Sequence, residues 1–247
     1  MVRRGNLAEM EFHFTFSNLE KQLISAKEYG YQFITCQDYV KAKSAKKIPC
    51  PVVVSRVDID FSCRKARRLA EIFNRIGGKA TFFVRLHAPE YNPFDFENYR
   101  CLKYIRDSGN EIGYHSEIVD QAAIWQEDPA DCLRRDISVL NHMLDIQIKG
   151  VASHRGMTGL NNLDFWSDKK PAEFDLLYEA YDKELTFNLF DTSFYISDSE
   201  WIRWKCYRNG ELVEAGHRNF GQHIADKHQL IYLLIHPDTY FDEHFYE

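Results

Sequence analysis

Features that mark whole classes of protein are missing from this chain of 247 residues. No apolar run approaches the roughly 18 residues that a membrane span requires. The opening residues, MVRRGNLAEMEFHF, have no apolar stretch after their arginines, so they do not resemble a secretory signal. The six cysteines show no Cys-x-x-Cys pair or zinc-ribbon spacing, which argues against a disulfide framework and favours reduced thiols. We therefore expect a cytoplasmic protein without a membrane span.

Neither sign of charge dominates, because 31 Lys and Arg stand against 37 Asp and Glu, a formal net charge of −6. Such a mild negative charge gives no reason to expect a nucleic-acid partner. The chain has no internal repeat, low-complexity tract or Gly/Ser linker, and its seven prolines are scattered. We expect one domain, residues 1–247, whose motif-bearing core spans about 51–240.

Apolar periodicity predicts strands and helices in alternation. The predicted strands cover 31–35, 51–59, 80–84, 111–114, 150–153 and 231–235, and the predicted helices cover 17–29, 62–76, 96–107 and 130–144. This alternation is typical of an α/β fold with a mostly parallel sheet, either open or closed into a barrel. Functional residues of such folds gather at the carboxyl ends of the strands.

The predicted strand 51–59 ends in two aspartates, Asp58 and Asp60. Residues two apart on a strand point to the same side, so both carboxylates can face one site. Close carboxylates repel each other unless a cation, a proton or an arginine compensates, and a divalent metal meets that need. A simpler interpretation is that Asp60 or Ser62 caps the following helix. Two aspartates at the end of a buried strand exceed what a cap requires, so we favour a metal site.

Three other strand ends carry histidine. His115 follows 111–114, His154 follows 150–153, and His236 follows 231–235. The carboxyl ends of parallel strands lie at one edge, so these side chains should face the aspartates. An aspartate with two histidines is typical of catalytic zinc, or of a related divalent ion, with a position left open for water.

Six segments carry a wider pattern, in the order VSRVDID, KATFFV, GNEIGYHS, ASHRG, YISDS and LLIHP. They resemble the motifs of the polysaccharide deacetylase family, the NodB-type carbohydrate esterases, and in particular a subset with an Asp-x-Asp first motif. The run from GGKATFF to NEIGYHS is the most specific part. The resemblance implies a distorted (β/α)7-type, NodB-like barrel and the removal of acetyl groups from glycans with a divalent metal.

The resemblance also implies roles for the matching residues. These are Asp58 as catalytic base, Asp60 as the metal-binding aspartate, His115 as the first metal histidine, Arg155 as the arginine that holds the base, Asp198 as the acidic residue that tunes the last histidine, and His236 as the general acid.

Two positions depart from the common pattern of the family. Ile59 separates aspartates that are usually adjacent, so the roles of Asp58 and Asp60 could be exchanged. The usual second metal histidine lies four residues after the first, where this chain has Val119, which cannot coordinate a metal. We take His154 as the substitute ligand, ahead of Asp120 and Glu117.

These residues suggest a metal-dependent hydrolase that removes an N-acyl group, acetyl or formyl, from a sugar or glycan precursor. The expected cofactor is one divalent ion, with zinc first and nickel, cobalt, manganese or iron as the other candidates. The expected substrate is an N-acylated sugar, nucleotide-linked or lipid-linked, in surface polysaccharide biosynthesis. One alternative is a catalytically inactive carbohydrate-binding member of the same fold. Another is an unrelated barrel metallohydrolase acting on a different amide or a phosphoester.

Three further histidines lie in the C-terminal part of the chain. His217, His223 and His228 have no tight ligand spacing, and we interpret them as part of a polar surface segment.

Overall fold

A single 10-stranded sheet organises the computed structural model, which describes residues 13–199, 203–215 and 218–244. The strands are β1 (Gln32–Ile34), β2 (Val52–Ile59), β3 (Thr81–Val84), β4 (Glu111–Ser116), β5 (Gly150–Ser153), β6 (Tyr178–Glu179), β7 (Phe194–Ser197), β8 (Lys205–Arg208), β9 (Glu211–Ala215) and β10 (Leu230–Ile235). Their order is β6-β5-β4-β3-β2-β10-β7-β8-β9, and β1 pairs with the first half of β2. Every pairing is parallel except β7 with β8 and β8 with β9. The chain therefore has the mostly parallel α/β sheet that the alternation predicts.

The sheet curls without closing. The Tyr232 hydroxyl on β10 donates a hydrogen bond to the carbonyl of Ala180, just beyond β6, over 3.2 Å. These residues come from strands that are far apart in the sheet order, so the two parts of the sheet bend toward each other. Within the described residues, no backbone pairing joins β6 to β9. The closed barrel implied by the family resemblance is therefore not confirmed.

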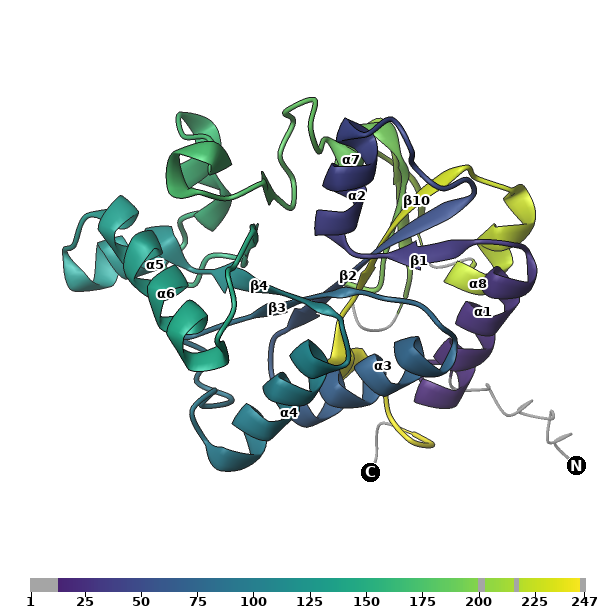
Figure 1. The fold of residues 1–247 in the computed structure, drawn as a ribbon, viewed down its shortest axis with the longest axis horizontal. Coiled ribbons are helices and arrows are strands. Elements are labelled where there is room, and N and C mark those ends of the chain that lie inside the picture. The colour runs from purple at the N-terminus through teal and green to yellow at the C-terminus, as the bar shows by residue number, and fades with distance from the viewer. Residues whose placement is uncertain (1–12, 200–202, 216–217, 245–247) are drawn as a thin grey trace, which may run out of the picture.

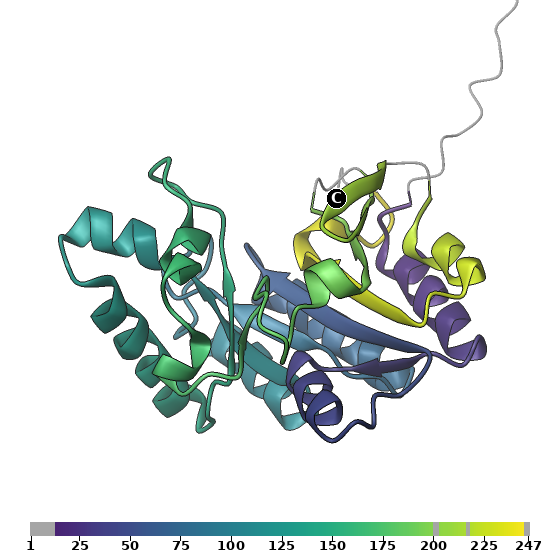
Figure 2. The ribbon, with the colours of Figure 1, turned by 90° about the horizontal axis from the view of Figure 1, so that it is seen from above.

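Helices cover the sheet and flank its ends (Figure 1). They are α1 (Phe16–Glu28), α2 (Cys36–Ser44), α3 (Cys63–Arg75), α4 (Phe96–Asp107), α5 (Ile118–Trp125), α6 (Pro129–Leu144), α7 (Leu189–Thr192) and α8 (Phe220–His223), with short 3-10 turns η1 (Asn162–Ser167), η2 (Pro171–Phe174), η3 (Ile224–Asp226) and η4 (Pro237–Thr239). Figures 1 and 2 both place α5 and α6 at one end of the molecule and α1 and α8 at the other. Of the helices described, none is long and apolar enough to cross a membrane.

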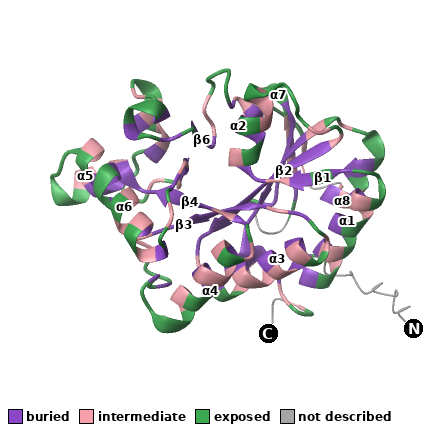
Figure 3. Cartoon of the chain, viewed as in Figure 1, coloured by how far each residue is buried: buried purple, intermediate pink, exposed green. Residues whose placement is uncertain are grey.

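Most strands are buried, with β9 the main exception, and most exposed residues lie on helices and loops (Figure 3). Alternate side chains of β2 enter two different cores. Val53, Val57 and Ile59 pack with α1, α3 and α4, whereas Val54 packs in a tyrosine-rich core under α2 and α7. The period of two then carries Arg56 and Asp58 to the same face as Val54. Arg56 and Asp58 therefore point to the inner, concave face of the sheet.

The helix after β2 has a cap of its own. The Ser62 hydroxyl accepts a hydrogen bond from the backbone N–H of Lys65 over 3.2 Å, which makes Ser62 the N-cap of α3. Buried residues Ala66, Leu69 and Phe73 hold the helix against the outer face of the sheet. Asp60 is not needed as a cap, so its carboxylate is available to the site.

Candidate metal and catalytic site

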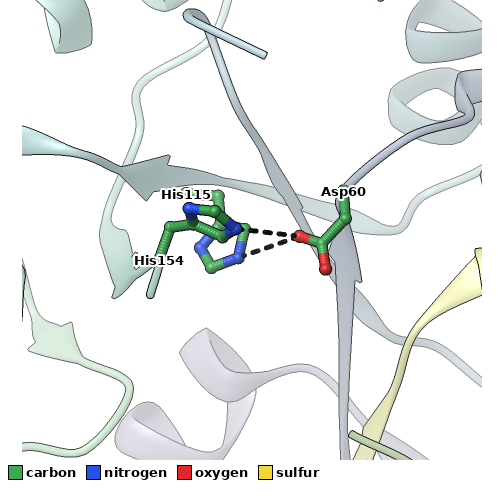
Figure 4. A group of neighbouring side chains, drawn as sticks. All are labelled: Asp60, His115 and His154. Atoms are coloured by element: carbon green, nitrogen blue, oxygen red, sulfur yellow. Dashed lines mark ion pairs between the residues drawn. The ribbon is translucent and has the colours of Figure 1, made fainter. Parts of the chain in front are cut away.

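Asp60, His115 and His154 converge at the carboxyl ends of β2, β4 and β5 (Figure 4). Nε2 of His115 lies 3.4 Å, and Nε2 of His154 3.8 Å, from Asp60 Oδ1. One potential ligand atom from each residue lies within 4.8 Å of the other two. Ligands of a tetrahedral zinc ion with bonds of about 2.1 Å lie roughly 3.4 Å apart. The three side chains are thus spaced as ligands of one small cation would be.

Polar groups on their outer sides orient the two imidazoles. Nδ1 of His115 donates to the carbonyl of Ala152 over 2.8 Å, which leaves Nε2 as the nitrogen that faces Asp60. Nδ1 of His154 lies 3.3 Å from Glu117, whose carboxylate accepts a 2.7 Å hydrogen bond from Arg85. Metal-binding histidines are commonly held in this way by a carbonyl or a carboxylate on the far ring nitrogen. Both histidines therefore present Nε2 to the same point.

The charges of this cluster also fit a cation. Asp60 Oδ1 is buried and has no hydrogen-bond partner among the described residues. Burial by itself would lower the pKa of His115, but Asp58 and Asp60 outweigh burial and raise it. Burial would raise the pKa of Asp60, yet His115 and the other nearby histidines lower it. The cluster thus attracts a positive charge, and its nitrogen and oxygen donors suit zinc and related divalent ions.

Asp58 is held by an arginine on its own strand. Arg56 donates two hydrogen bonds to the Asp58 carboxylate, Nε to Oδ1 over 2.8 Å and Nη2 to Oδ2 over 2.7 Å, and both side chains are buried. The guanidinium carbon lies 4.7 Å from the ring centre of Tyr181, which packs against it. Burial would raise the pKa of Asp58, but the charges of Arg56 and His115 hold it below its usual range. Asp58 also lies 3.5 Å from His115 Nε2, beside the metal cluster.

The expected partner of Asp58 was Arg155, and the structure differs here. Arg155 is exposed and lines the rim of the site, while both hydrogen bonds to Asp58 come from Arg56. The reason is the strand period, because Arg56 lies two residues before Asp58 and on the same face. The strand period that places Asp58 and Asp60 on one face also places Arg56 there, so the sequence contained the information needed to predict Arg56 as the partner of Asp58.

His236 and Asp198 form a buried pair at the ends of β10 and β7. Nδ1 of His236 lies 2.7 Å from Asp198 Oδ1, and Asp198 also accepts a hydrogen bond from the backbone N–H of His236 over 3.0 Å. Burial alone would lower the pKa of His236, but Asp198 outweighs burial and raises it to about 9. The imidazole is therefore protonated at neutral pH, with Nε2 left for other contacts. This matches the pairing expected from the sequence.

Neither Val119 nor Asp120 belongs to the cluster. The side chain of Val119 packs against the core, and its backbone N–H donates to Asn162. Asp120 accepts hydrogen bonds from the backbone N–H groups of Met157 and Thr158, which ties down the loop after β5. Of the substitutes considered for the missing histidine, His154 is the residue that lies beside Asp60.

A cavity of about 530 Å³ joins these groups. Its lining includes all the expected site residues except Asp198, which lies behind His236, and it adds Arg56, Tyr181, Ser199 and Lys205. Asp58, the cluster of Asp60, His115 and His154, and the imidazole of His236 thus face one space that can admit a small molecule.

Comparisons with known proteins find little. No known protein family matches the chain, and neither does any curated protein. A solved structure, that of Streptococcus pyogenes deacetylase PplD in complex with acetate, is similar over 63% of this chain and 67% of that chain, at 18% identity and a TM-score of 0.46. At this identity and TM-score the likeness adds nothing to what the side chains themselves show.

Proposed function

We propose that this protein is a metal-dependent hydrolase that removes an N-acyl group from a sugar or glycan precursor. One observation carries the proposal: a cation cluster, an arginine-bound carboxylate and a protonated histidine line the same 530 Å³ cavity. Amide hydrolysis needs an activated water, stabilisation of the oxyanion and a proton for the departing amine, and these groups supply each of them.

Asp60, His115 and His154 would hold the metal ion. A bound divalent ion, with zinc the best match, would lower the pKa of water and polarise the acyl carbonyl. The carbonyl of Ala152 and the carboxylate of Glu117 keep the two imidazoles turned toward the cavity.

Asp58 would act as the general base. Arg56 keeps its carboxylate ionised and fixed, so it can accept a proton from the attacking water. Asp58 rather than Asp60 has this role because Asp60 is the aspartate closer to both histidines.

His236 would act as the general acid. Its imidazole is protonated at neutral pH and is oriented by Asp198, so it can pass a proton to the amine nitrogen as the amide bond breaks. The pKa values of Asp58 and His236 are pushed apart, one down and one up, and a base and an acid that work together need this separation.

The nature of the substrate rests on the motif resemblance. It favours an N-acetyl or N-formyl sugar, nucleotide-linked or lipid-linked, in surface polysaccharide synthesis in the cytoplasm. Arg155 and Lys205 at the cavity bring positive charge that a phosphate-linked sugar could use.

The test combines metal analysis with a screen for acyl release. Tag-free protein, purified without chelator, should contain about one equivalent of divalent metal and release acetate or formate from members of a panel of N-acylated sugar nucleotides and lipid-linked sugars. Asp58→Asn keeps the shape of the side chain and should retain the metal while losing about 10²–10⁴ in rate. If Asp58→Asn instead loses the metal, Asp58 is the metal ligand and Asp60 is the base. The non-catalytic alternative would be favoured if the wild-type protein bound glycans, bound no metal and released no acyl group.

A further inference from the structure

A second group of possible metal ligands lies in the segment His223-x-x-Asp226-x-His228. A polar surface segment is what the sequence suggests for these histidines, and for His223 that interpretation is wrong, because its side chain is only 1% exposed. His217, grouped with them earlier, lies outside the described residues. A buried histidine needs partners for its nitrogens, so the surroundings of this segment require an explanation.

The donor atoms of the three side chains point to one another. Nδ1 of His223 lies 3.5 Å, and Nε2 of His228 3.7 Å, from Asp226 Oδ2. One donor atom from each residue lies within 4.8 Å of the other two, as in the cluster at Asp60. Both nitrogens are buried and, among the described residues, lack a hydrogen-bond partner. Two buried imidazole nitrogens that face one carboxylate form a donor set that suits a divalent cation.

Local backbone structure builds this arrangement from six consecutive residues. His223 ends α8, and the turn η3 places Asp226 one turn further on. Lys227 has a left-handed backbone, with φ of 56°, which turns the chain so that His228 comes back beside Asp226. The ring of His228 stacks on Phe194 with centroids 3.8 Å apart, which fixes its plane. Packing thus fixes the positions of the donors.

Neighbouring side chains support the outer sides of the group. Nε2 of His223 lies 3.2 Å from Cys206 Sγ and 3.8 Å from Glu214, so Nδ1 is left for the cluster. Arg218 donates to Asp226 Oδ2 over 2.7 Å. The same oxygen, Oδ2, lies 3.5 Å from His223 Nδ1 and 3.7 Å from His228 Nε2. A carboxylate oxygen has two lone pairs, so Oδ2 can accept from Arg218 and still face a cation, and ligating carboxylates are commonly hydrogen-bonded in this way.

We propose that His223, Asp226 and His228 form a second site for one divalent transition-metal ion, independent of the candidate active site. Two imidazoles and one carboxylate again suit zinc, and Asp226 is the open side through which an ion and a water molecule would enter. His228 precedes β10 and His236 follows it, so the two sites lie at opposite ends of this strand, about 26 Å apart along it. The second ion would therefore tie the start of β10 to α8 rather than contact the substrate.

The test uses protein in which the first site is removed. Tag-free Asp60→Asn/His154→Ala protein, titrated with Zn²⁺ and with Co²⁺, should bind one equivalent, show the absorption of a low-coordinate Co²⁺ site, and melt at a higher temperature with zinc than without. Adding His228→Phe keeps a ring on Phe194 but removes the donor nitrogen, and it should weaken Zn²⁺ binding at least tenfold and abolish the zinc-dependent rise in melting temperature. His142→Phe, an exposed histidine on α6, is the matched control and should change neither.

Two results would overturn the proposal. The first is that Asp60→Asn/His154→Ala protein, shown to be folded by circular dichroism, binds no zinc. The second is that His228→Phe leaves binding unchanged. Should the first-site variant fail to fold, the wild-type background answers the same question, because His228→Phe must then remove one equivalent of zinc and leave the other. Loss of acyl-release activity plays no part in these measurements, so they are independent of the proposed function.

Discussion

The pair of Arg56 and Asp58 allows the most searching test of the site. Replacing Arg56 with Met keeps much of the side-chain volume and removes both hydrogen bonds to Asp58, leaving a buried carboxylate without its arginine. Breaking a buried ion pair by removing one partner costs about 3–5 kcal/mol of unfolding free energy. That is a large part of the roughly 5–15 kcal/mol that holds a domain together. We expect Arg56→Met to lower the urea midpoint of unfolding accordingly.

Activity should change in a way that a general loss of stability would not cause. Without Arg56, burial acts on Asp58 with less opposition, so its pKa rises and a smaller fraction is ionised. We expect kcat/KM at neutral pH to fall by about 10²–10⁴ and the acid limb of the pH profile to move to higher pH. The sign follows from the base being active only when ionised, so raising the pH should restore part of the rate.

A double variant separates the stability effect of the Arg56–Asp58 ion pair from the effects of the single substitutions. Asp58→Asn removes the charge that Arg56→Met leaves unpaired, so the double variant should be more stable than Arg56→Met alone. Arg155→Met is the matched control, because that guanidinium is exposed, and it should leave both stability and the acid limb unchanged. The reasoning would be refuted if Arg155→Met reproduced the shift, or if Arg56→Met left the pH profile in place.

Other consequences of the site can be measured with single changes. Activity should fall as the pH rises through about 9, where His236 loses its proton. Asp198→Asn should move this basic limb of the pH profile to lower pH, because it removes the main contribution that raises the pKa of His236. A basic limb that does not move would exclude His236 as the acid. Glu117→Gln weakens the support of His154 and should reduce metal affinity by about 10–100-fold in equilibrium dialysis. Chelation of the metal should lower the melting temperature, since an ion present at a hundred times its Kd stabilises the folded state by about 2.7 kcal/mol, and re-addition of zinc should restore it.

Long amphipathic helices and buried strands could be predicted closely from the sequence, whereas short helices and exposed strands could not. The predicted helix 96–107 and strand 150–153 have the bounds of α4 and β5. Helix α2 was missed, because it is short and buries only Cys36, Tyr39 and Val40. The hairpin of β8 and β9 was missed as well, since Leu212 and Val213 are exposed and give no buried stripe.

The hairpin nevertheless carries a sequence signal. Asn209 and Gly210 both have positive φ, 52° and 74°, and Asn-Gly between two short strands is the strongest local indication of a two-residue hairpin turn. Closure of the sheet has no comparable signal. The alternation of strands and helices is the same for an open sheet and a barrel, and the difference lies in pairings between distant strands.

The site shows the same division between what is local and what depends on strand order. The aspartates and histidines of the site were predicted from their places at strand ends, which the chain specifies locally, whereas Asp198 was implied only by the motif resemblance. The hydrogen-bond partners of these residues depend on which strands are neighbours in the sheet. The carbonyl of Ala152 reaches His115 because β4 lies beside β5. Asp198 reaches His236 because β10 lies beside β7. Arg56 is the exception that could have been found, since it shares a strand face with Asp58 and needs no neighbour. Because Arg56 holds Asp58 from within the same strand, the site does not require Arg155 for that purpose, and this accounts for an arginine that lines the cavity yet is exposed.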